Sequence, residues 1–428
     1  MIALVVVSLL FLLLAVGAPI GFTLTVTGAL GIFWIGGWSA VMGVLGSMPR
    51  ESAAVFEFAT IPMFLLMAEF VLRSGIADDL FHAAAAWFGR LRGGLGIATA
   101  LAGAGFGAIC GSSTASAATL SSTSLPAMIK YGYETRMAAG VVAISGTLAM
   151  LIPPSIAMVV YGMLADVSIA KLLIAGVFPG LLVTLTIALT VYFLAWKNPE
   201  HAPLVDRASW RERVLSLTRV GPMLVLLMAV TGVIYLGVAT PTEASAIGAM
   251  SAAILYFMRA RRTAREVYNV FARATRTSCM LAMILLGAHL FSTFFALTQT
   301  TQSVIGWVGA LPVDRWIILL IIVVIYIVLG CFLDQMAILV LTIPIVAPLL
   351  KSLGFDLVWF GVIAVVTAEL GMVTPPFGLN VFVVSRYSGT PVSDVFRGTL
   401  PHVVAHLIAI GILLAFPALS LWLPNQMN

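Results

Sequence analysis

The chain has 428 residues, of which 61% are hydrophobic and only 9% are charged. A water-soluble protein of this length needs far more charge to cover its surface, so the composition excludes one. The net charge is +5. The arginine clusters lie at the ends of apolar segments, which argues against a nucleic-acid-binding protein.

Runs of about 20 apolar residues recur along the whole chain, and each can cross roughly 30 Å of hydrocarbon as a helix. The first run lacks a basic start and a small-residue cleavage site, so we expect a retained span and not a signal peptide. Residues 80–91 are amphipathic, and residues 93–130 are predicted to form a helical hairpin. The predicted spans of the first half are 2–17, 20–36, 54–72, 136–160 and 171–195.

The second half repeats this order after a charged linker at 197–219. An arm is predicted at 298–312 and a second hairpin at 316–350. The motif "ATPTEA" predicts a turn and a helix start with Glu243 in the first turn. The predicted spans are 220–237, 243–258, 277–297, 356–380 and 400–423.

The two halves align with each other under a shift of 222 residues, without gaps over a long tract. The matched pairs include Gly132 with Gly354, Met150 with Met372, Pro153 with Pro375, Pro154 with Pro376, Gly176 with Gly398 and Pro179 with Pro401. Residues 1–196 and 220–428 are therefore predicted to be repeats. Each has five crossings and one hairpin that turns back, and five is odd, so the second repeat is expected to be inverted.

The distribution of positive charge supports this topology. With the linker in the cytoplasm, 18 of the 22 basic residues fall inside, among them Arg207 of the linker. The four outside are Arg50, Lys171, Arg315 and Lys351. Both hairpins are therefore predicted to be re-entrant, and both termini to lie outside. The expected fold is an all-α polytopic membrane protein of two inverted repeats.

Two of the predicted spans contain a Pro-Pro pair, in "LAMLIPPSIAMVVYG" at 148–162 and "LGMVTPPFGLNVFVV" at 370–384. Proline removes a backbone donor and clashes with the preceding turn, which exposes the ends of two half-helices. Such ends are tolerated in a membrane only inside protein or beside a wet cavity. A packing kink is the simpler explanation for one proline, whereas paired breaks in two repeats indicate the midplane site of a secondary transporter.

The predicted hairpin tips carry polar groups. In "GAICGSSTASAATLSS", Gly107 and Gly111 permit a tight turn, and the following hydroxyls could bind a small hard cation or simply allow close helix packing. In "GCFLDQMA", Asp334 is the one acid between residues 316 and 350. It could bind sodium or a proton, cap the second helix of the hairpin, or do both. Glu369 is a possible second buried acid.

Other polar residues and motifs have simpler interpretations. Glu69 is predicted to pair with Arg73 one turn on. His402 and His406 have no accompanying acid or third ligand and are interpreted as structural.

The sequence lacks the common hydrolase, metalloprotease and P-loop motifs, so it contains no ATP site, and an ion gradient or a partner must supply the energy for transport. The three cysteines show no metal-binding spacing.

The stretches "GAICGSSTASAATLSSTSLPAMIKYGY", "GTLAMLIPPSIAMVVYG" and "LGMVTPPFGLNVFVV" resemble the large membrane subunit of tripartite ATP-independent periplasmic (TRAP) transporters, the DctM-like family. The resemblance covers essentially the whole chain. It implies a sodium-driven importer of organic acids in the bacterial inner membrane, with an elevator-like transport domain. It also implies two partners, a four-helix DctQ-like membrane subunit and a DctP-like periplasmic binding protein.

The resemblance also places two or more sodium sites between the hairpin tips and the broken helices, with substrate between them. The expected sodium ligands, through side chains or backbone, are Ser112, Ser113, Thr114, Pro153, Asp334, Gly371, Thr374 and Pro376. The expected substrate-binding residues are Gly111, Pro154, Ser155, Gly378 and Asn380.

Two other functions stay open on the sequence alone. One is a stand-alone ion-coupled carrier or a channel, which would work without a binding protein. The other is a membrane-embedded enzyme that uses Asp334 and Glu369 as an acid pair. Nothing in the sequence separates dicarboxylates, sialic acids, keto acids and ectoine as substrates.

Overall fold

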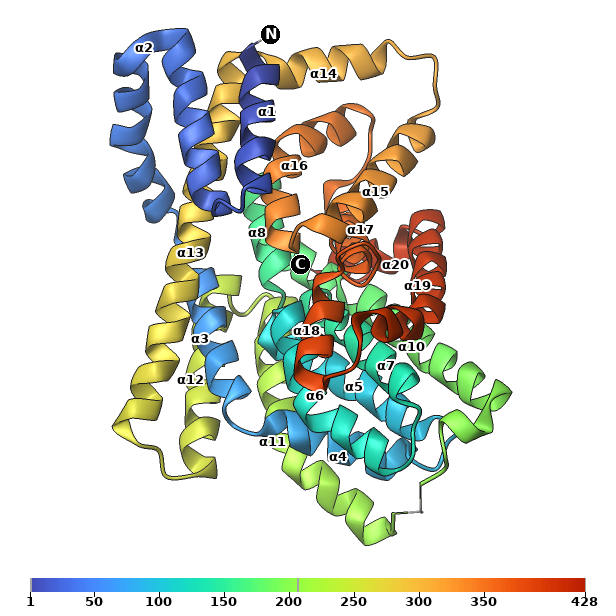
Figure 1. Ribbon diagram of the computed structural model, residues 1–428. Coiled ribbons are helices and arrows are strands. Elements are labelled where there is room, and N and C mark those ends of the chain that lie inside the picture. The colour runs from blue at the N-terminus through green and yellow to red at the C-terminus, as the bar shows by residue number, and fades with distance from the viewer. Residues whose placement is uncertain (1, 206–207, 428) are drawn as a thin grey trace.

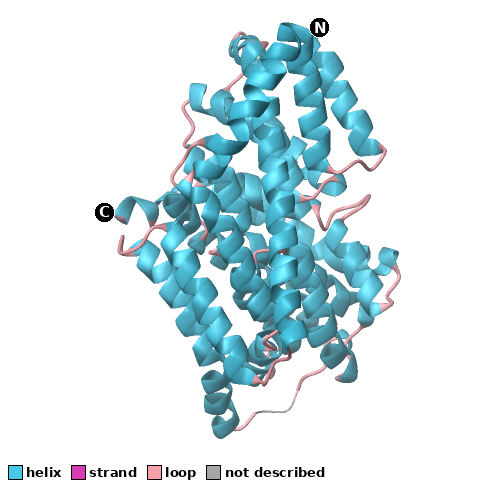
Figure 2. Ribbon diagram, turned by 90° about the vertical axis from the view of Figure 1, so that its left-hand side faces the viewer, coloured by secondary structure: helices cyan, strands magenta, loops and turns pink. Residues whose placement is uncertain are grey.

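The computed structural model describes residues 2–205 and 208–427, and these form helices joined by loops, with no β-strand among them (Figure 2). The predicted all-helical fold is confirmed. Arg207, one of the basic residues assigned to the cytoplasm, lies outside the described residues.

The helices of the first half run as far as the linker. They are α1 (Ile2–Ala15), α2 (Ile20–Ala54), η1 (Phe56–Ala59), α3 (Thr60–Leu72), α4 (Ile76–Phe88), α5 (Gly94–Cys110), α6 (Ser113–Lys130), α7 (Thr135–Thr147), η2 (Leu148–Met150), α8 (Ile156–Ala165), α9 (Ile169–Ala175), α10 (Val177–Lys197) and η3 (Pro199–His201).

The second half follows the linker. Its helices are α11 (Trp210–Tyr235), α12 (Pro241–Arg259), α13 (Ala264–Leu297), α14 (Thr300–Gly309), α15 (Arg315–Phe332), α16 (Gln335–Ser352), α17 (Leu357–Gly371), α18 (Leu379–Ser388), α19 (Val392–Ala415), α20 (Ala418–Leu421) and η4 (Pro424–Gln426). In both halves a helical hairpin precedes a helix, a Pro-Pro break and a shorter helix. The inverted relation between the halves stays a prediction.

The largest departure from the predicted spans is in α2. The predicted span 20–36 is only its first leg, because Gly37 has a φ of +66° and the chain reverses there. The second leg continues to Ala54, so the predicted span 54–72 is interrupted before α3 begins at Thr60. Figure 1 shows the two legs of α2 side by side.

Three other helices extend beyond their predicted bounds for local reasons. Helix α13 begins at Ala264 and not at 277, because Thr263 and Glu266 form a reciprocal capping box there. Helix α18 runs to Ser388 and not to 380, and Gly389 ends it with a φ of +70°. Helix α19 begins at Val392 and not at 400.

By length and composition alone, seven of the described helices could cross a membrane, or eight if the bent pair around α3 and α4 counts as one; this count includes α2, although the chain reverses within it at Gly37. The two arms α15 and α16 are among the seven, although a tight turn joins them as one hairpin. The shorter apolar helices include α7, α8 and α17, which flank the two Pro-Pro breaks. Figure 1 shows α14 along the top of the molecule and α4 near the opposite end.

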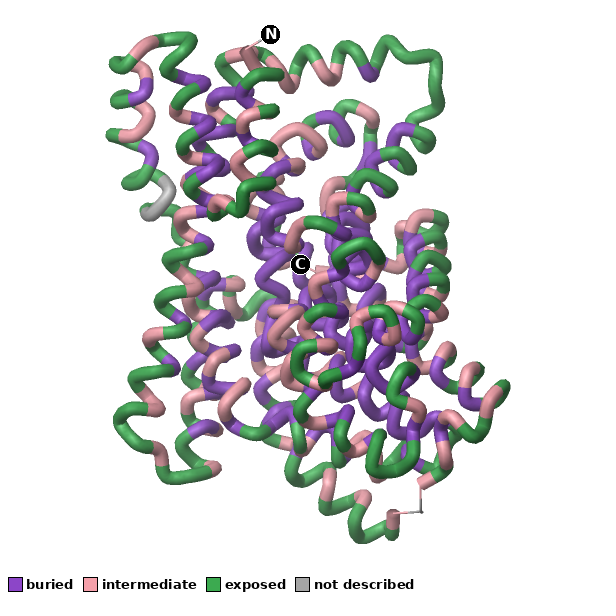
Figure 3. The backbone as a smooth tube through the Cα atoms, in the orientation of Figure 1, coloured by how far each residue is buried: buried purple, intermediate pink, exposed green. Residues whose placement is uncertain are grey.

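The packing of the helices has two parts. Helix α2 packs along α13, and α12 packs along α3. The hairpins pack against the broken helices, α6 against α7 and α18, and α16 against α8 and α17. This second part holds most of the buried residues (Figure 3), including every residue of α17 from Trp359 to Gly371. The core therefore surrounds the breaks and the hairpin tips.

Candidate functional site

The tip of the first hairpin is a tight turn between α5 and α6. Gly111 follows α5 with a φ of +58°, a conformation that favours glycine. Ser112 then caps α6, since its Oγ accepts a hydrogen bond from the Ala115 N–H at 3.4 Å. The hydroxyls of Ser112 and Thr114 lie 3.4 Å apart and both residues are half-buried, whereas Ser113 is fully buried.

The tip of the second hairpin has the same construction with an acid in place of the serine. Asp334, which is 222 residues after Ser112, caps α16 by accepting a hydrogen bond from the Met336 N–H at 3.2 Å. The capping role predicted for Asp334 is therefore confirmed, and its role in ion binding stays a prediction. The next residue, Gln335, is fully buried and donates from Nε2 to the Val365 carbonyl at 3.4 Å.

The first break lies between η2 and α8, and its peptide bond between Pro153 and Pro154 is cis. Ser155 caps α8 by accepting from the Met158 N–H at 3.3 Å, and its hydroxyl donates to the Met150 carbonyl. Both prolines and Ser155 are buried. The sequence therefore folds into two half-helices joined by a buried, hydrogen-bonded link.

The second break, between α17 and α18, also has a cis Pro-Pro bond but is exposed. Thr374 donates from Oγ1 to the Leu370 carbonyl at 2.7 Å, and the Asn380 N–H donates to the Met372 carbonyl at 3.1 Å. Gly378 starts α18 with a φ of +46°. Phe377 packs against Phe332 of the second hairpin with ring centroids 5.5 Å apart.

Each hairpin packs closely against the broken helix of its own half. A Cβ at Gly107 would lie 2.6 Å from the Ala149 Cα, and a Cβ at Gly371 would lie 2.4 Å from the Gly330 Cα. Such contacts need glycine, because the backbones approach more closely than a side chain allows. The first helix of each hairpin therefore packs against the broken helix of its own half, and ion binding between tip and break stays a prediction. Gly111 also lies against Ile156, just after the first break.

Buried polar side chains also connect the first hairpin to the second broken helix. The Ser113 hydroxyl donates to Glu369 Oε2 at 2.9 Å, and Asn380 Nδ2 donates to Ser113 Oγ at 2.7 Å. Asn380 Nδ2 also lies 3.5 Å from the Ala143 carbonyl of α7. The structure thus brings together Ser113 from the predicted sodium set, Asn380 from the predicted substrate set, and Glu369 from neither.

The sequence contained a signal for Glu369 that the predicted site did not use. It is the one acid within α17, and an acid in an apolar helix is a candidate for function. The internal repeat counted against it, because Thr147 occupies the equivalent position. Gln335 was also missed, although it directly follows Asp334.

The charges of the two acids are not balanced by nearby basic side chains. Among residues 2–205 and 208–427, no Lys, Arg or His nitrogen lies within 4 Å of the carboxylate oxygens of Asp334 or Glu369. Elsewhere the predicted pair of Glu69 and Arg73 does form, at 3.3 Å. The hydroxyl, carboxylate and carbonyl oxygens near the tips are the kind of ligand atom that hard cations prefer.

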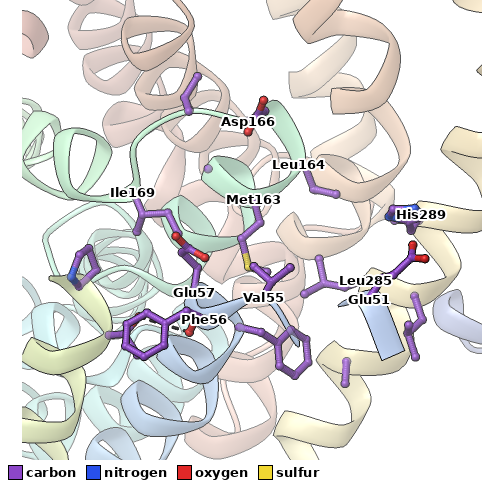
Figure 4. A pocket seen from close by; sticks show the side chains of 18 of the residues that line it. Glu51, Val55, Phe56, Glu57, Met163, Leu164, Asp166, Ile169, Leu285 and His289 are labelled. Carbon is purple, nitrogen blue, oxygen red and sulfur yellow. Dashed lines mark hydrogen bonds between the residues drawn. The ribbon is translucent and has the colours of Figure 1, made fainter. Parts of the chain in front are cut away.

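A cavity of about 880 Å³ lies away from these residues, between two groups of helices (Figure 4). One wall comes from the end of α2, η1 and α13, with Glu51, Phe56 and His289. The other comes from the end of α8 with Met163, from the turn into α9 with Asp166, and from α16. None of the predicted sodium or substrate residues lines this cavity.

The chain matches known proteins over nearly its full length. A family model described as "Tripartite ATP-independent periplasmic transporter, DctM component" matches residues 7–419. The chain belongs to this family. It is a multi-pass membrane protein and a large permease component of a tripartite transport system.

Two relatives of this TRAP permease illustrate the family. The C4-dicarboxylate TRAP transporter large permease protein DctM of Pseudomonas aeruginosa is 37% identical over 379 residues, which cover 88% of each chain. The ectoine/5-hydroxyectoine TRAP transporter large permease protein UehC of Ruegeria pomeroyi is 33% identical over 366 residues, or 85% of each chain. The names of these two relatives refer to chemically different solutes.

The fold also resembles a solved transporter. The YdaH transporter of Alcanivorax borkumensis superposes with a TM-score of 0.63 over 89% of each chain, at 15% sequence identity. At this identity the likeness concerns the fold alone. It agrees with an all-helical transporter architecture for the TRAP permease.

Proposed function

We propose that this chain is the large permease subunit of a sodium-coupled TRAP transporter that imports an organic acid or a similar small solute. The main support is the pair of hairpin tips, each capped by an oxygen-bearing side chain and each packed against a Pro-Pro break. In an inverted-repeat transporter such breaks hold the coupling ions and the substrate near the bilayer midplane.

The proposed sodium sites use one tip each. The first combines Ser112, Ser113 and Thr114 with backbone near Pro153, and the second combines Asp334 with backbone near Gly371, Thr374 and Pro376. The half-buried position of Ser112 and Asp334 supports this assignment, because a coupling ion must both enter and leave. The Asp334 carboxylate can cap α16 with one oxygen and bind an ion with the other.

The proposed substrate site lies between the two breaks. Its residues are Gly111, Pro154, Ser155, Gly378 and Asn380. Ser155 and Asn380 are fully buried and hydrogen-bonded within the protein, so a solute can reach them only after this region rearranges. The exposed second break offers the more accessible side of the site.

An elevator mechanism would move the hairpins and broken helices against α1–α3 and α11–α13. The 880 Å³ cavity supports this division, because its walls come from both groups. The proposed partners are a DctQ-like membrane subunit and a DctP-like periplasmic binding protein, as the tripartite family implies. The proposed location is the bacterial inner membrane, with both termini in the periplasm.

The experiment is uptake into proteoliposomes that contain both membrane subunits, with the binding protein and a candidate organic acid outside. Sodium-driven uptake is expected in the wild type and should be lost or strongly reduced in Asp334→Asn. Asp314→Asn is the matched control, because Asp314 caps α15 in the same way, by accepting from the Trp316 N–H at 2.8 Å, and is exposed. Asparagine caps helices as well as aspartate does, so both variants should fold.

Three results would contradict the proposal. Uptake that needs no sodium gradient would reject sodium coupling. Uptake without the binding protein would favour a stand-alone carrier or channel. Full activity of Asp334→Asn would remove Asp334 from the ion sites.

A further inference from the structure

The buried carboxylate of Glu369 belongs to neither of the proposed sodium sites. Its side chain is 1% exposed, and it projects from the last turn of α17 just before the second break. A charged carboxylate removed from water is costly unless it has a partner of opposite charge or enough hydrogen bonds. Glu369 therefore needs either a bound proton or a cation beside it.

The hydrogen bonds of Glu369 are too few to supply that stabilisation. Its Oε2 accepts from the Ser113 hydroxyl, and its Oε1 has no hydrogen-bond partner among the described residues. The Asn380 side chain donates from Nδ2 to the Ser113 hydroxyl oxygen. Its own Oδ1 is also buried and has no hydrogen-bond partner within the described part of the chain. Two buried oxygens in one hydrogen-bonded cluster thus lack a donor.

The position of Glu369 on its helix adds to the unfavourable charge. The C-terminal end of a helix carries a partial negative charge, so an acid in the last turn is repelled there and a cation is attracted. Within the described ranges, no basic side chain lies within 4 Å of this carboxylate. A small cation would balance both the carboxylate and the helix end.

A purely structural role accounts for only part of this cluster. The hydrogen bonds do join hairpin helix α6 to α17 and α18, and thereby one half of the chain to the other. However, a glutamine could accept the same bond from Ser113 without burying a charge. The acid and the unpartnered oxygens indicate an additional ligand.

We propose that Glu369, Asn380 and Ser113 bind a sodium ion at the junction between the first hairpin and the second broken helix. The inference rests on the sodium coupling proposed above. It adds an ion that shares Ser113 with the first tip and Asn380 with the substrate site, and whose acid comes from the opposite repeat. Its ligands would be side-chain oxygens from α6, α17 and α18. A bound ion would hold the first hairpin and the second broken helix together, so sodium would stabilise this junction as well as the tips.

The test is direct binding of radioactive sodium to the purified permease in lipid nanodiscs, together with sodium-dependent melting temperatures. Glu369→Gln keeps the shape and the bond from Ser113 but removes the charge. It is expected to bind one ion fewer than the wild type, or to bind one ion roughly tenfold more weakly, as loss of a charged ligand implies. Glu369→Asp keeps the acid and should recover part of the binding.

The controls separate this inference from the proposed function. Asp314→Asn should bind sodium as the wild type does, since Asp314 is an exposed cap. If the wild type binds no sodium at all, the sodium-coupled function fails and this site fails with it. If the wild type binds sodium and Glu369→Gln binds the same number of ions with unchanged affinity, only the further site is refuted. Should Glu369→Gln not fold, Asn380→Ala takes its place, because Asn380 belongs to neither sodium site at the hairpin tips; the same loss is expected, and unchanged binding would refute the site.

Discussion

The close contact between Gly330 of the second hairpin and Gly371 of the second broken helix allows a quantitative prediction. A Cβ at Gly371 would lie 2.4 Å from the Gly330 Cα and 2.6 Å from the Ile327 carbonyl oxygen. Ordinary contacts of a Cβ begin at about 3.4 Å. Gly371→Ala therefore requires α15 and α17 to separate by about 1 Å, because backbone atoms cannot rotate away.

The expected cost follows from this overlap. Overpacking of a buried contact typically costs about 1–3 kcal/mol, and a backbone contact belongs at the upper end. Alanine recovers about 1 kcal/mol of helix propensity relative to glycine. The net expectation for Gly371→Ala is a loss of about 2 kcal/mol in the free energy of unfolding.

The assay is thermal unfolding of the purified permease in detergent, followed by tryptophan fluorescence. Gly411→Ala is the matched control, because Gly411 is exposed within α19 and a Cβ there meets no atom of the described residues within 4 Å. Gly371→Ala should melt below the wild type, and Gly411→Ala at or slightly above it. Equal melting temperatures for Gly371→Ala and the wild type would refute the packing argument.

Three further substitutions test other parts of the structure. Ser112→Ala removes a hydroxyl of the first tip and should raise the sodium concentration for half-maximal uptake; an unchanged value would remove Ser112 from the site. Ser155→Ala loses the cap of α8 and should lower the free energy of unfolding by about 1 kcal/mol, measured by melting temperature. Arg259→Ala breaks a half-buried ion pair with Asp79 at 2.5 Å and two bonds to backbone carbonyls, so it should lower the melting temperature more than Arg397→Ala, whose ion pair is exposed. Equal effects of the two arginine substitutions would contradict this reading.

Local sequence determined the approximate positions of most helices and of the two Pro-Pro interruptions. Apolar runs located the spans, because a helix must keep its backbone paired in lipid. The Pro-Pro pairs located both breaks, since proline cannot donate the hydrogen bond that continues a helix. The serine and aspartate at the hairpin tips cap the following helices, as side chains of this kind do in any context.

Only the tertiary structure decided which side chains meet. The second leg of α2, which follows the reversal at Gly37, was not predicted, because residues 37–54 contain glycine, serine and proline and lack a run of about 20 apolar residues. The bond between Ser113 and Glu369 joins residues 256 positions apart, and neither the local pattern nor the internal repeat points to it. Such pairs depend on how α6, α17 and α18 pack together, which is set by close contacts across the whole fold and not by the sequence around any one of them.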